Sequence, residues 1–294
     1  MKISEEGRLF IENCTIADSK RDEGLTIPES IEYISGISYG PDEKYQNLDI
    51  CFPKENDGKL PVIVSVHGGA YVYGSAALYR FYAADLAKRG FAVINFDYRL
   101  APYAKFPAPL EDLNAVLEKI ATKEFTDKYP LDKNNVFIVG DSAGAQITCQ
   151  YGTIFTNDEY RKLFKLNKPA ITLRGLGLNC GKYVFLDEEL DPKRESIYTD
   201  YFGENPRAFG EMLEGYKYTT KDFPPSYILS APADFLLPFA EPTRDYLQNL
   251  GVKCECKIYG DETTGHVFHV DVRSEIGKQA NDDETEFFKA LIVK

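Results

Sequence analysis

The sequence predicts an α/β protein built on a largely parallel sheet, and three observations indicate this class. Short runs rich in β-branched residues alternate with longer amphipathic segments, which is the pattern of strands joined by crossover helices. The run at 61–66 is apolar almost throughout, as expected of a strand buried on both faces. Glycine-rich turns follow two of the runs, at 67–69 and 140–144. We therefore expect a sheet whose carboxyl ends carry the functional loops.

Each element is placed by its own local signals. Strands are expected at 61–66, 91–96, 135–139, 171–179, 226–230 and 253–259. Helices are expected at 8–14, 76–89, 109–123, 142–155, 238–250 and 284–293. Gly90 and Gly251 follow two of these helices, where glycine commonly ends a helix. Pro109 lies in the first turn of another, where proline is tolerated.

Two segments interrupt the alternation and are expected to form a cap. Residues 1–36 are polar, and residues 181–224 are rich in Tyr, Glu, Lys, Asp and Pro without a strand pattern. A connection of more than 40 residues is too long for a plain loop between strands. We expect an N-terminal cap segment at 1–36 and a main domain at 37–294, with a helical cap insertion at about 181–224.

The composition argues against some classes of partner. The net charge is −12, from 34 basic and 46 acidic residues, and an acidic surface repels phosphate backbones and anionic lipid headgroups. We expect neither a nucleic-acid partner nor membrane association. The first residues lack the apolar run of a secretory signal, and no apolar stretch approaches the roughly 20 residues that span a bilayer. The expected location is cytoplasmic, where thiols stay reduced.

The cysteines do not predict a metal site. The chain has six, and Cys254 and Cys256 would point the same way on a strand. A zinc site needs three or four converging ligands, and only three histidines are available in the whole chain. We therefore expect no bound metal.

The strongest chemical signal is Gly140-Asp141-Ser142-Ala143-Gly144, which follows a predicted strand and opens a predicted helix. A serine at such a corner is held in a strained turn that exposes its hydroxyl, and the turn requires small neighbours. The helix N-terminus also favours negative charge developing beside it. A helix-capping role is the alternative for this serine, but the context favours a nucleophile.

A second glycine-rich loop, His67-Gly68-Gly69, ends the strand at 61–66. Backbone N–H groups in such a loop can donate hydrogen bonds to an oxyanion, because no Cβ blocks the approach. We expect the donors to be the N–H groups of Gly68 and Gly69, together with that of Ala143 in the serine turn. His67 precedes the glycines and is expected to brace the loop.

A nucleophilic serine needs a base and an acid that orients it. Only His266 and His269 follow Ser142 in the chain. His266 lies in a polar loop after the last predicted strand, whereas His269 has apolar neighbours that suit a packed position. Asp234 follows the strand at 226–230 and is the expected acid, ahead of Asp245 and Asp261. The predicted triad is therefore Ser142, Asp234 and His266.

Together these residues resemble the hormone-sensitive-lipase-like branch of the α/β-hydrolases, which includes bacterial acetyl esterases and carboxylesterases. The matching pieces occur in family order: His67-Gly68-Gly69, Asp97-Tyr98-Arg99-Leu100-Ala101-Pro102, Phe106-Pro107-Ala108-Pro109-Leu110-Glu111-Asp112, Gly140-Asp141-Ser142-Ala143-Gly144, Asp234 and Gly265-His266-Val267-Phe268. The resemblance implies an α/β-hydrolase fold with a mostly parallel eight-stranded sheet flanked by helices, a helical cap and no cofactor. It implies a serine carboxylesterase that cleaves short-chain, acetyl-like esters through an acyl-enzyme.

Three residues bear on the substrate. Many family members have a third glycine where this chain has Ala70, whose methyl group would lie near the acyl site and disfavour bulky acids and tertiary-alcohol esters. Tyr71 and Tyr73 follow, and tyrosines of this kind can line a pocket for a sugar or aryl alcohol group. Ala70, Tyr71 and Tyr73 are therefore candidate substrate-binding residues, and acetylated sugars are candidate substrates.

Some alternatives stay open at this level. The same scaffold and triad can cleave an aryl formamide or a peptide bond. Some relatives have lost catalysis and bind small ligands, although they usually lack a triad member and none is missing here. The predicted strand at 253–259 could pair across a homodimer if it lies at the sheet edge, and a monomer is the alternative.

Overall fold

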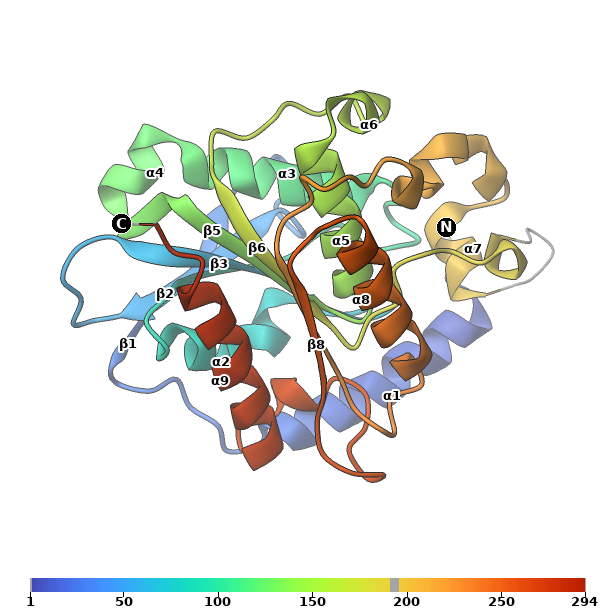
Figure 1. Cartoon of the computed structure of the whole chain (residues 1–294). Coiled ribbons are helices and arrows are strands. Elements are labelled where there is room, and N and C mark those ends of the chain that lie inside the picture. Colours follow the sequence, from blue (N-terminus) through green and yellow to red (C-terminus); the bar gives the residue numbers. More distant parts are fainter. Residues whose placement is uncertain (1, 191–195, 294) are drawn as a thin grey trace.

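The computed structural model describes residues 2–190 and 196–293. A single eight-stranded sheet crosses the molecule in the order β1-β2-β4-β3-β5-β6-β7-β8 (Figure 1). Strand β2 runs antiparallel to both of its neighbours, and the remaining pairs are parallel. The predicted mostly parallel, eight-stranded sheet is confirmed. The strands are β1 (Ile31–Ser38), β2 (Asn47–Pro53), β3 (Leu60–Val66), β4 (Ala92–Phe96), β5 (Leu131–Asp141), β6 (Leu173–Asn179), β7 (Ser226–Ser230) and β8 (Cys254–Ile258).

Helices cover both faces of the sheet. Helices α2 and α9 pack on one face, while α3, α5 and α8 pack on the other. The α-helices are α1 (Glu5–Asp22), α2 (Ala76–Ala87), α3 (Ala108–Ala121), α4 (Lys123–Lys128), α5 (Ala143–Thr156), α6 (Asp158–Leu163), α7 (Ile197–Phe202), α8 (Ala240–Asn249) and α9 (Glu275–Lys289). Short 3₁₀ helices span Asp187–Leu190, Pro206–Leu213, Gly215–Lys217, Leu237–Phe239 and Phe268–Val270.

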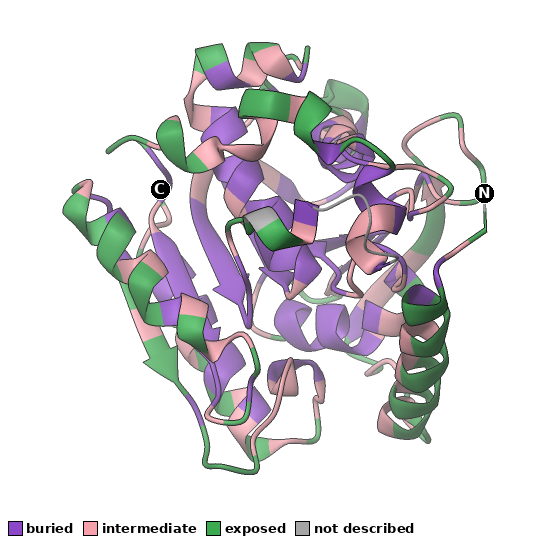
Figure 2. Ribbon diagram, turned by 90° about the vertical axis from the view of Figure 1, so that its right-hand side faces the viewer, coloured by how far each residue is buried: buried purple, intermediate pink, exposed green. Residues whose placement is uncertain are grey.

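The strand sequences explain this three-layer arrangement. Successive side chains of a strand point to opposite faces, so Val62 and Val64 join the core under α3 and α5, whereas Ile63 joins the core under α2 and α9. Both faces of the central strands are therefore buried, as Figure 2 shows. On the second face, Phe137 of β5 stacks on Phe288 of α9 with ring centroids 4.6 Å apart, which anchors the last helix to the sheet.

The sheet contains two strands that the sequence patterns did not place. Strands β1 and β2 lie at the antiparallel edge, and their polar and apolar residues mix because β1 is only partly buried. The predicted boundary at residue 36 falls inside β1, so the sheet begins within the segment assigned to the cap. Helix α1 is also longer than the predicted 8–14. The Ser4 side chain caps its N-terminus, and the basic residues Lys20 and Arg21 lie in its last turn, which ends at Asp22.

The last helix differs from its predicted range of 284–293. It begins at Glu275, where the Ser274 hydroxyl accepts a hydrogen bond from the Gly277 N–H. Its first turns are polar, so hydrophobic periodicity detected only the second half. It ends at Lys289, because the chain then turns to bond with Asn135, whose side chain pairs with both backbone groups of Val293.

The N-terminal helix is tied to the insertion between β6 and β7. The carboxylate of Asp200, at the start of α7, accepts hydrogen bonds from the Ser4 backbone N–H at 3.0 Å and from the Ser4 hydroxyl at 2.6 Å. Helix α1 is otherwise exposed along most of its length (Figure 2). Among the described residues, the insertion holds α7 and three of the 3₁₀ helices. The N-terminal helix α1 and the insertion between β6 and β7 therefore form one continuous structure beside the sheet (Figure 1).

Two chain-wide features complete the fold. All six cysteine thiols are free. Across residues 2–190 and 196–293, no helix has the length and apolar character required to cross a membrane.

Candidate active site

Ser142 occupies a strained turn between β5 and α5. Its backbone has φ 53° and ψ −118°, a region that non-glycine residues rarely adopt. The flanking glycines are required by space, since a Cβ at Gly140 would lie 2.3 Å from the Gly144 carbonyl oxygen, and one at Gly144 would lie 2.1 Å from that of Val66. The Ser142 N–H donates to the Asn179 carbonyl at 3.0 Å, which ties the turn to the neighbouring strand β6.

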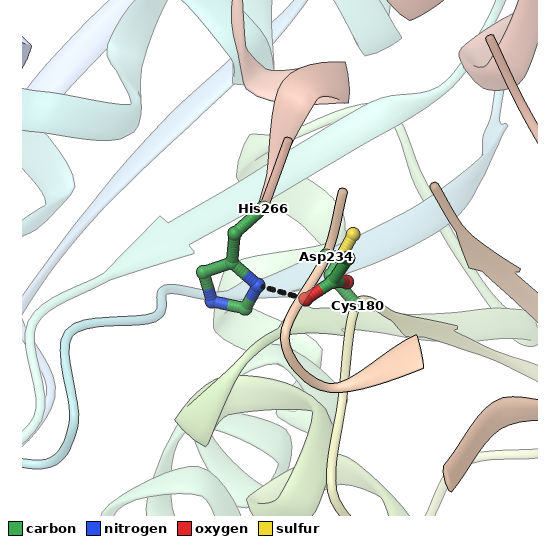
Figure 3. A group of neighbouring side chains, drawn as sticks. All are labelled: Cys180, Asp234 and His266. Carbon is green, nitrogen blue, oxygen red and sulfur yellow. Dashed lines mark hydrogen bonds and ion pairs between the residues drawn. The ribbon is translucent and has the colours of Figure 1, made fainter. Parts of the chain in front are cut away.

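The structure brings together the three residues predicted as a triad. The Nε2 atom of His266 lies 2.9 Å from Ser142 Oγ, and its Nδ1 atom lies 2.8 Å from Asp234 Oδ1. A carboxylate can only accept, so Nδ1 carries the proton and Nε2 is left to accept from the serine hydroxyl. Figure 3 shows the imidazole directed at the Asp234 carboxylate. The Asp234 and His266 loops are held together by a bridge between Ala233 and Gly265.

Asp234 is buried and fully hydrogen-bonded. Its side chain has no exposed surface, and besides His266 it accepts from the Leu236 N–H at 2.9 Å and the Ser230 hydroxyl at 3.0 Å. Burial alone raises the pKa of a carboxyl group, but the hydrogen bond and charge of His266 and the other donors outweigh it and hold the pKa of Asp234 below its usual value. Asp234 therefore faces the imidazole as an anion.

Cys180 is a member of this group that sequence reasoning missed. It follows β6, is fully buried, and its Sγ lies within 4.8 Å of the Asp234 and His266 ligand atoms (Figure 3). Burial and the nearby Asp234 charge raise the pKa of its thiol well above the ordinary value. A metal would need this thiol deprotonated, so the group fits a hydrogen-bonded triad better than a metal site.

The other two histidines are buried and lie away from the serine hydroxyl. His67 stacks on Tyr98 with ring centroids 4.1 Å apart, and its Nδ1 donates to the Gly68 carbonyl at 2.7 Å. Burial lowers its pKa to about 4, so it is neutral near neutral pH and braces the loop, as expected. His269 is fully buried beside Tyr82 and Phe268, which confirms its packed position.

The structure of the glycine-rich loop contradicts one of the predicted oxyanion donors, the N–H of Gly68. The Gly68 N–H donates to the Tyr79 hydroxyl at 3.1 Å, and that hydroxyl donates in turn to Asp141 at 2.7 Å. The Gly68 N–H is thus turned toward helix α2 and is engaged by the protein. The prediction that it faces an oxyanion is wrong, because the direction of each N–H depends on loop dihedrals that a Gly-Gly pattern does not fix.

Three other N–H groups belong to residues that line the cavity beside the serine. Within the described residues, those of Gly69, Ala70 and Ala143 have no acceptor in the protein, and all three residues line the cavity that contains Ser142. Gly69, Ala70 and Tyr71 all have positive φ, at 115°, 50° and 66°. The loop beside Ser142 therefore has a backbone conformation that non-glycine residues rarely adopt.

The cavity around Ser142 has a volume of about 360 Å³. Ala70, Tyr71 and Tyr73, the candidate substrate-binding residues, all line it. Tyr71 is held by stacking on Tyr201 at 3.9 Å between ring centroids, and the Tyr73 hydroxyl donates to Asp18 at 2.9 Å. Helix α1 thus forms one wall of the cavity, a contribution that its polar sequence did not reveal.

Comparison with known proteins defines the class. A family model described as the alpha/beta hydrolase fold matches residues 63–270, so this chain belongs to that family, in its hormone-sensitive-lipase-like branch. The acetyl esterase of Salmonella paratyphi A is 27% identical over 249 residues, which cover 76% of this chain and 71% of that protein. Esterase LipC of Mycobacterium tuberculosis is 24% identical over 225 residues, covering 73% of this chain and 54% of that protein.

Solved structures share the fold. Esterase B from Lactobacillus rhamnosis aligns with a TM-score of 0.85 at 21% identity, covering 97% of this chain and 93% of that chain. A hyperthermophilic esterase from Pyrobaculum calidifontis aligns with a TM-score of 0.72 at 20% identity, covering 99% and 93%. The matched region spans 62%, 54% and 48% of the length of three curated relatives.

Proposed function

We propose that this protein is a serine carboxylesterase that hydrolyses short-chain, acetyl-like esters through an acyl-enzyme. The observation that carries the proposal is the continuous hydrogen-bonded relay from Ser142 through His266 to the buried Asp234. This relay is the arrangement that converts a serine hydroxyl into a nucleophile. The esterases among the relatives support ester bonds as the target.

The mechanism follows from the geometry. As Ser142 Oγ attacks the ester carbonyl, His266 Nε2 accepts its proton, and the Asp234 carboxylate stabilises the resulting imidazolium. The tetrahedral intermediate collapses when His266 returns the proton to the departing alcohol oxygen, which leaves an ester on Ser142. A water molecule then attacks this acyl-enzyme while giving its proton to His266, and the acid is released as Ser142 recovers its own.

The oxyanion of each tetrahedral intermediate would be bound by the N–H groups of Gly69, Ala70 and Ala143. All three line the cavity and have no acceptor among the described residues. Each donor placed in this way stabilises the transition state by about 3 kcal/mol. The dipole of helix α5, which begins at Ala143, adds to this effect at its N-terminus.

The cavity also bears on the alcohol part of the substrate. Toward helix α1 it is lined by the polar side chains of Asp18, Arg21 and Tyr73, which are joined to one another by hydrogen bonds. Such groups suit a hydroxyl-rich alcohol, so acetylated sugars belong among the substrates to be tested. An aryl formamide or a peptide bond would use the same relay, and a panel of acetyl esters, formamides and peptides separates these reactions.

The proposal is tested by labelling and by turnover. A fluorophosphonate probe should modify wild-type protein on Ser142, and Ser142→Ala should be unlabelled and inactive on p-nitrophenyl acetate while keeping native circular dichroism. Thr156→Ala, at the far end of the same helix, is the matched control. Unlabelled wild-type protein that binds an ester without cleaving it would instead identify a catalytically silent ligand-binding homologue.

A further inference from the structure

The end of strand β6 contacts two members of the proposed triad. The Asn179 carbonyl accepts a hydrogen bond from the Ser142 N–H at 3.0 Å, and the next residue, Cys180, has its thiol within 4.8 Å of the Asp234 carboxylate. In the pairing of β5 with β6, Asn179 also lies opposite Asp141, the residue before the serine. The position of this strand end therefore affects both the nucleophile and the acid.

A group of buried polar side chains lies behind this strand end, between the sheet and helices α2 and α9. Each has at most 2% of its surface exposed, and the members are Tyr82, Asn179, His269, Asn281 and Glu284. Within residues 2–190 and 196–293, eight of their nitrogen and oxygen atoms have no hydrogen-bond partner at ordinary distance and angle. Buried polar atoms are normally paired because an unpaired one is costly, so these residues do more than fill space.

Contacts join this group to both catalytic loops. The rings of Tyr82 and His269 meet edge to face with centroids 5.5 Å apart. The Asn281 amide donates to the His269 carbonyl at 3.0 Å, which fastens α9 to the loop of the proposed catalytic histidine. Asn179 lies close enough to Glu284 to lower the pKa of that carboxyl group. The group thus extends from the histidine loop to the end of β6.

Glu284 is the one carboxyl group among these five side chains, and the sheet leaves room for it. A Cβ at Gly177 would lie 2.1 Å from Glu284 Oε1, so any side chain there would displace the carboxyl. Gly177 precedes Asn179 by two residues and therefore faces the same side of β6. Burial raises the pKa of Glu284 to about 8, so near neutral pH it is an acid with one O–H to donate. That O–H can pair with the Asn179 side-chain oxygen.

Few charges act on Glu284. Arg89 of α2 lowers its pKa and Asp141 of β5 raises it, but Arg89 is ion-paired with two aspartates, one on α2 and one on α9, and Asp141 titrates with a pKa of about 6. The other titratable groups of this region stay neutral near pH 8 because burial shifts their pKa values away from it: Tyr82 of α2, Tyr227 of β7 and His269. Glu284 is therefore the group of this set that changes charge near pH 8.

We propose that protonated Glu284 is a positioning residue for the reaction at Ser142, acting through Asn179. The acid holds the Asn179 side chain on one face of the sheet, and the carbonyl of the same residue holds the Ser142 N–H at the strand end. A displacement of about 1 Å in such a group can cost roughly a hundredfold in rate. This inference rests on the proposed function and adds a residue that contacts no reacting atom.

Side-chain replacement separates positioning from packing. Glu284→Ala should lower kcat on p-nitrophenyl acetate by between tenfold and about a hundredfold at pH 7, with little change in KM because the cavity is untouched. Glu284→Gln keeps a donor and an acceptor and should restore kcat to near the wild-type value. Thr285→Ala is the control, since Thr285 is buried and its hydroxyl bonds only within α9. Wild-type kcat in folded Glu284→Ala would overturn the role, whereas inactive wild-type protein would overturn the proposed function instead.

The strand side of the contact provides a second test. The methyl group of Gly177→Ala would displace the Glu284 carboxyl, so kcat should fall in the wild-type background but fall no further in Glu284→Ala. Gly175→Ala, on the same face of β6, would contact Leu291, Pro225 and Phe137 instead and should leave kcat unchanged. Equal losses from Gly177→Ala in both backgrounds would show that this glycine acts independently of Glu284.

The pH profile tests the protonated form without any truncated side chain. Above about pH 8, wild-type kcat should fall as Glu284 ionises and loses its O–H donor, whereas Glu284→Gln should keep its kcat over the same range. Glu286→Gln, exposed on the same helix, should follow the wild type. Coincident alkaline limbs for wild type and Glu284→Gln would overturn the proposal, whether or not Glu284→Ala folds.

Discussion

The backbone N–H of Gly68 donates to the hydroxyl of Tyr79 across 3.1 Å. This contact joins the glycine-rich loop at 67–69 to helix α2, and the same hydroxyl donates to Asp141 beside Ser142. Tyr79 therefore holds the two loops that would carry the oxyanion donors, one after β3 and one after β5. The Tyr79 hydroxyl would therefore affect the reaction only by positioning these two loops, because it contacts no reacting atom.

Tyr79→Phe should lower kcat by between tenfold and about a hundredfold, because small displacements of positioned groups weaken the transition-state contacts. KM should change less, and steady-state kinetics on p-nitrophenyl acetate measures both. Tyr82→Phe is the matched control, since Tyr82 lies one turn further along α2 and its buried hydroxyl has no partner among the described residues. Equal losses in both variants would point to general damage of α2.

Asp234→Asn should reduce kcat by about 10⁴-fold while leaving the fold intact. The amide can present its N–H to His266 Nδ1, which would then accept and leave the proton on Nε2, the wrong tautomer for accepting from Ser142. The measurement is turnover of p-nitrophenyl acetate. Asp245→Asn, in the exposed helix α8, should retain wild-type turnover. Substantial activity in Asp234→Asn would show that the imidazole is oriented by another group.

Cys180→Ala should raise the pH at which Asp234 takes up its proton, and a profile of the Asp234 carboxyl ¹³C chemical shift against pH measures this. The Cys180 thiol is one of the donors that lower the pKa of Asp234, so its removal lets Asp234 take up a proton at a less acidic pH. Cys180→Ser restores a donor and should restore the profile. Cys51→Ala, a buried cysteine of β2, serves as the control for lost packing. Coincident profiles for Cys180→Ala and wild type would exclude this role.

The side chains of the proposed triad were predictable because each follows a strand at a turn with strong local chemistry. Ser142 has glycines on both sides that the close packing requires, and His266 was the one histidine after it in a polar loop. The direction of the Gly68 N–H was not predictable, since it depends on Tyr79, eleven residues away, and on the dihedrals of Ala70 and Tyr71.

Other features depend on contacts between distant segments. Strand β1 is partly exposed and pairs only with β2, so neither alternation nor continuous apolarity marks it clearly. Cys180 looks like a small buried residue in the sequence, and its place beside Asp234 arises only when the ends of β6 and β7 meet. Helix α1 likewise lies beside the cavity through contacts with distant segments, among them the Ser4 and Asp200 pairing and the hydrogen bond from Tyr73 to Asp18.

Glu284 on α9 is an unusual buried carboxyl group on the opposite face of the sheet from α5. It has no exposed surface, and Tyr82 and Asn179 are among the polar groups near it. Burial raises its pKa from an ordinary 4.5 to about 8, although Asn179 and Arg89 oppose the shift. The folded protein therefore keeps this proton up to about pH 8, whereas the unfolded chain releases it near pH 4.5.

Glu284→Gln should stabilise the protein progressively as the pH rises. Between about pH 4.5 and pH 8 the folded state binds more protons at this position, so wild-type stability falls with rising pH by up to about 1.4 kcal/mol per unit. Glutamine has a similar shape and does not titrate. In urea unfolding, the stability of Glu284→Gln relative to wild type should thus increase from the acid to the alkaline end of this window. Glu286→Gln, exposed on the same helix, should show no such trend, and a pH-independent difference for Glu284→Gln would mean that Glu284 is ionised in the folded protein.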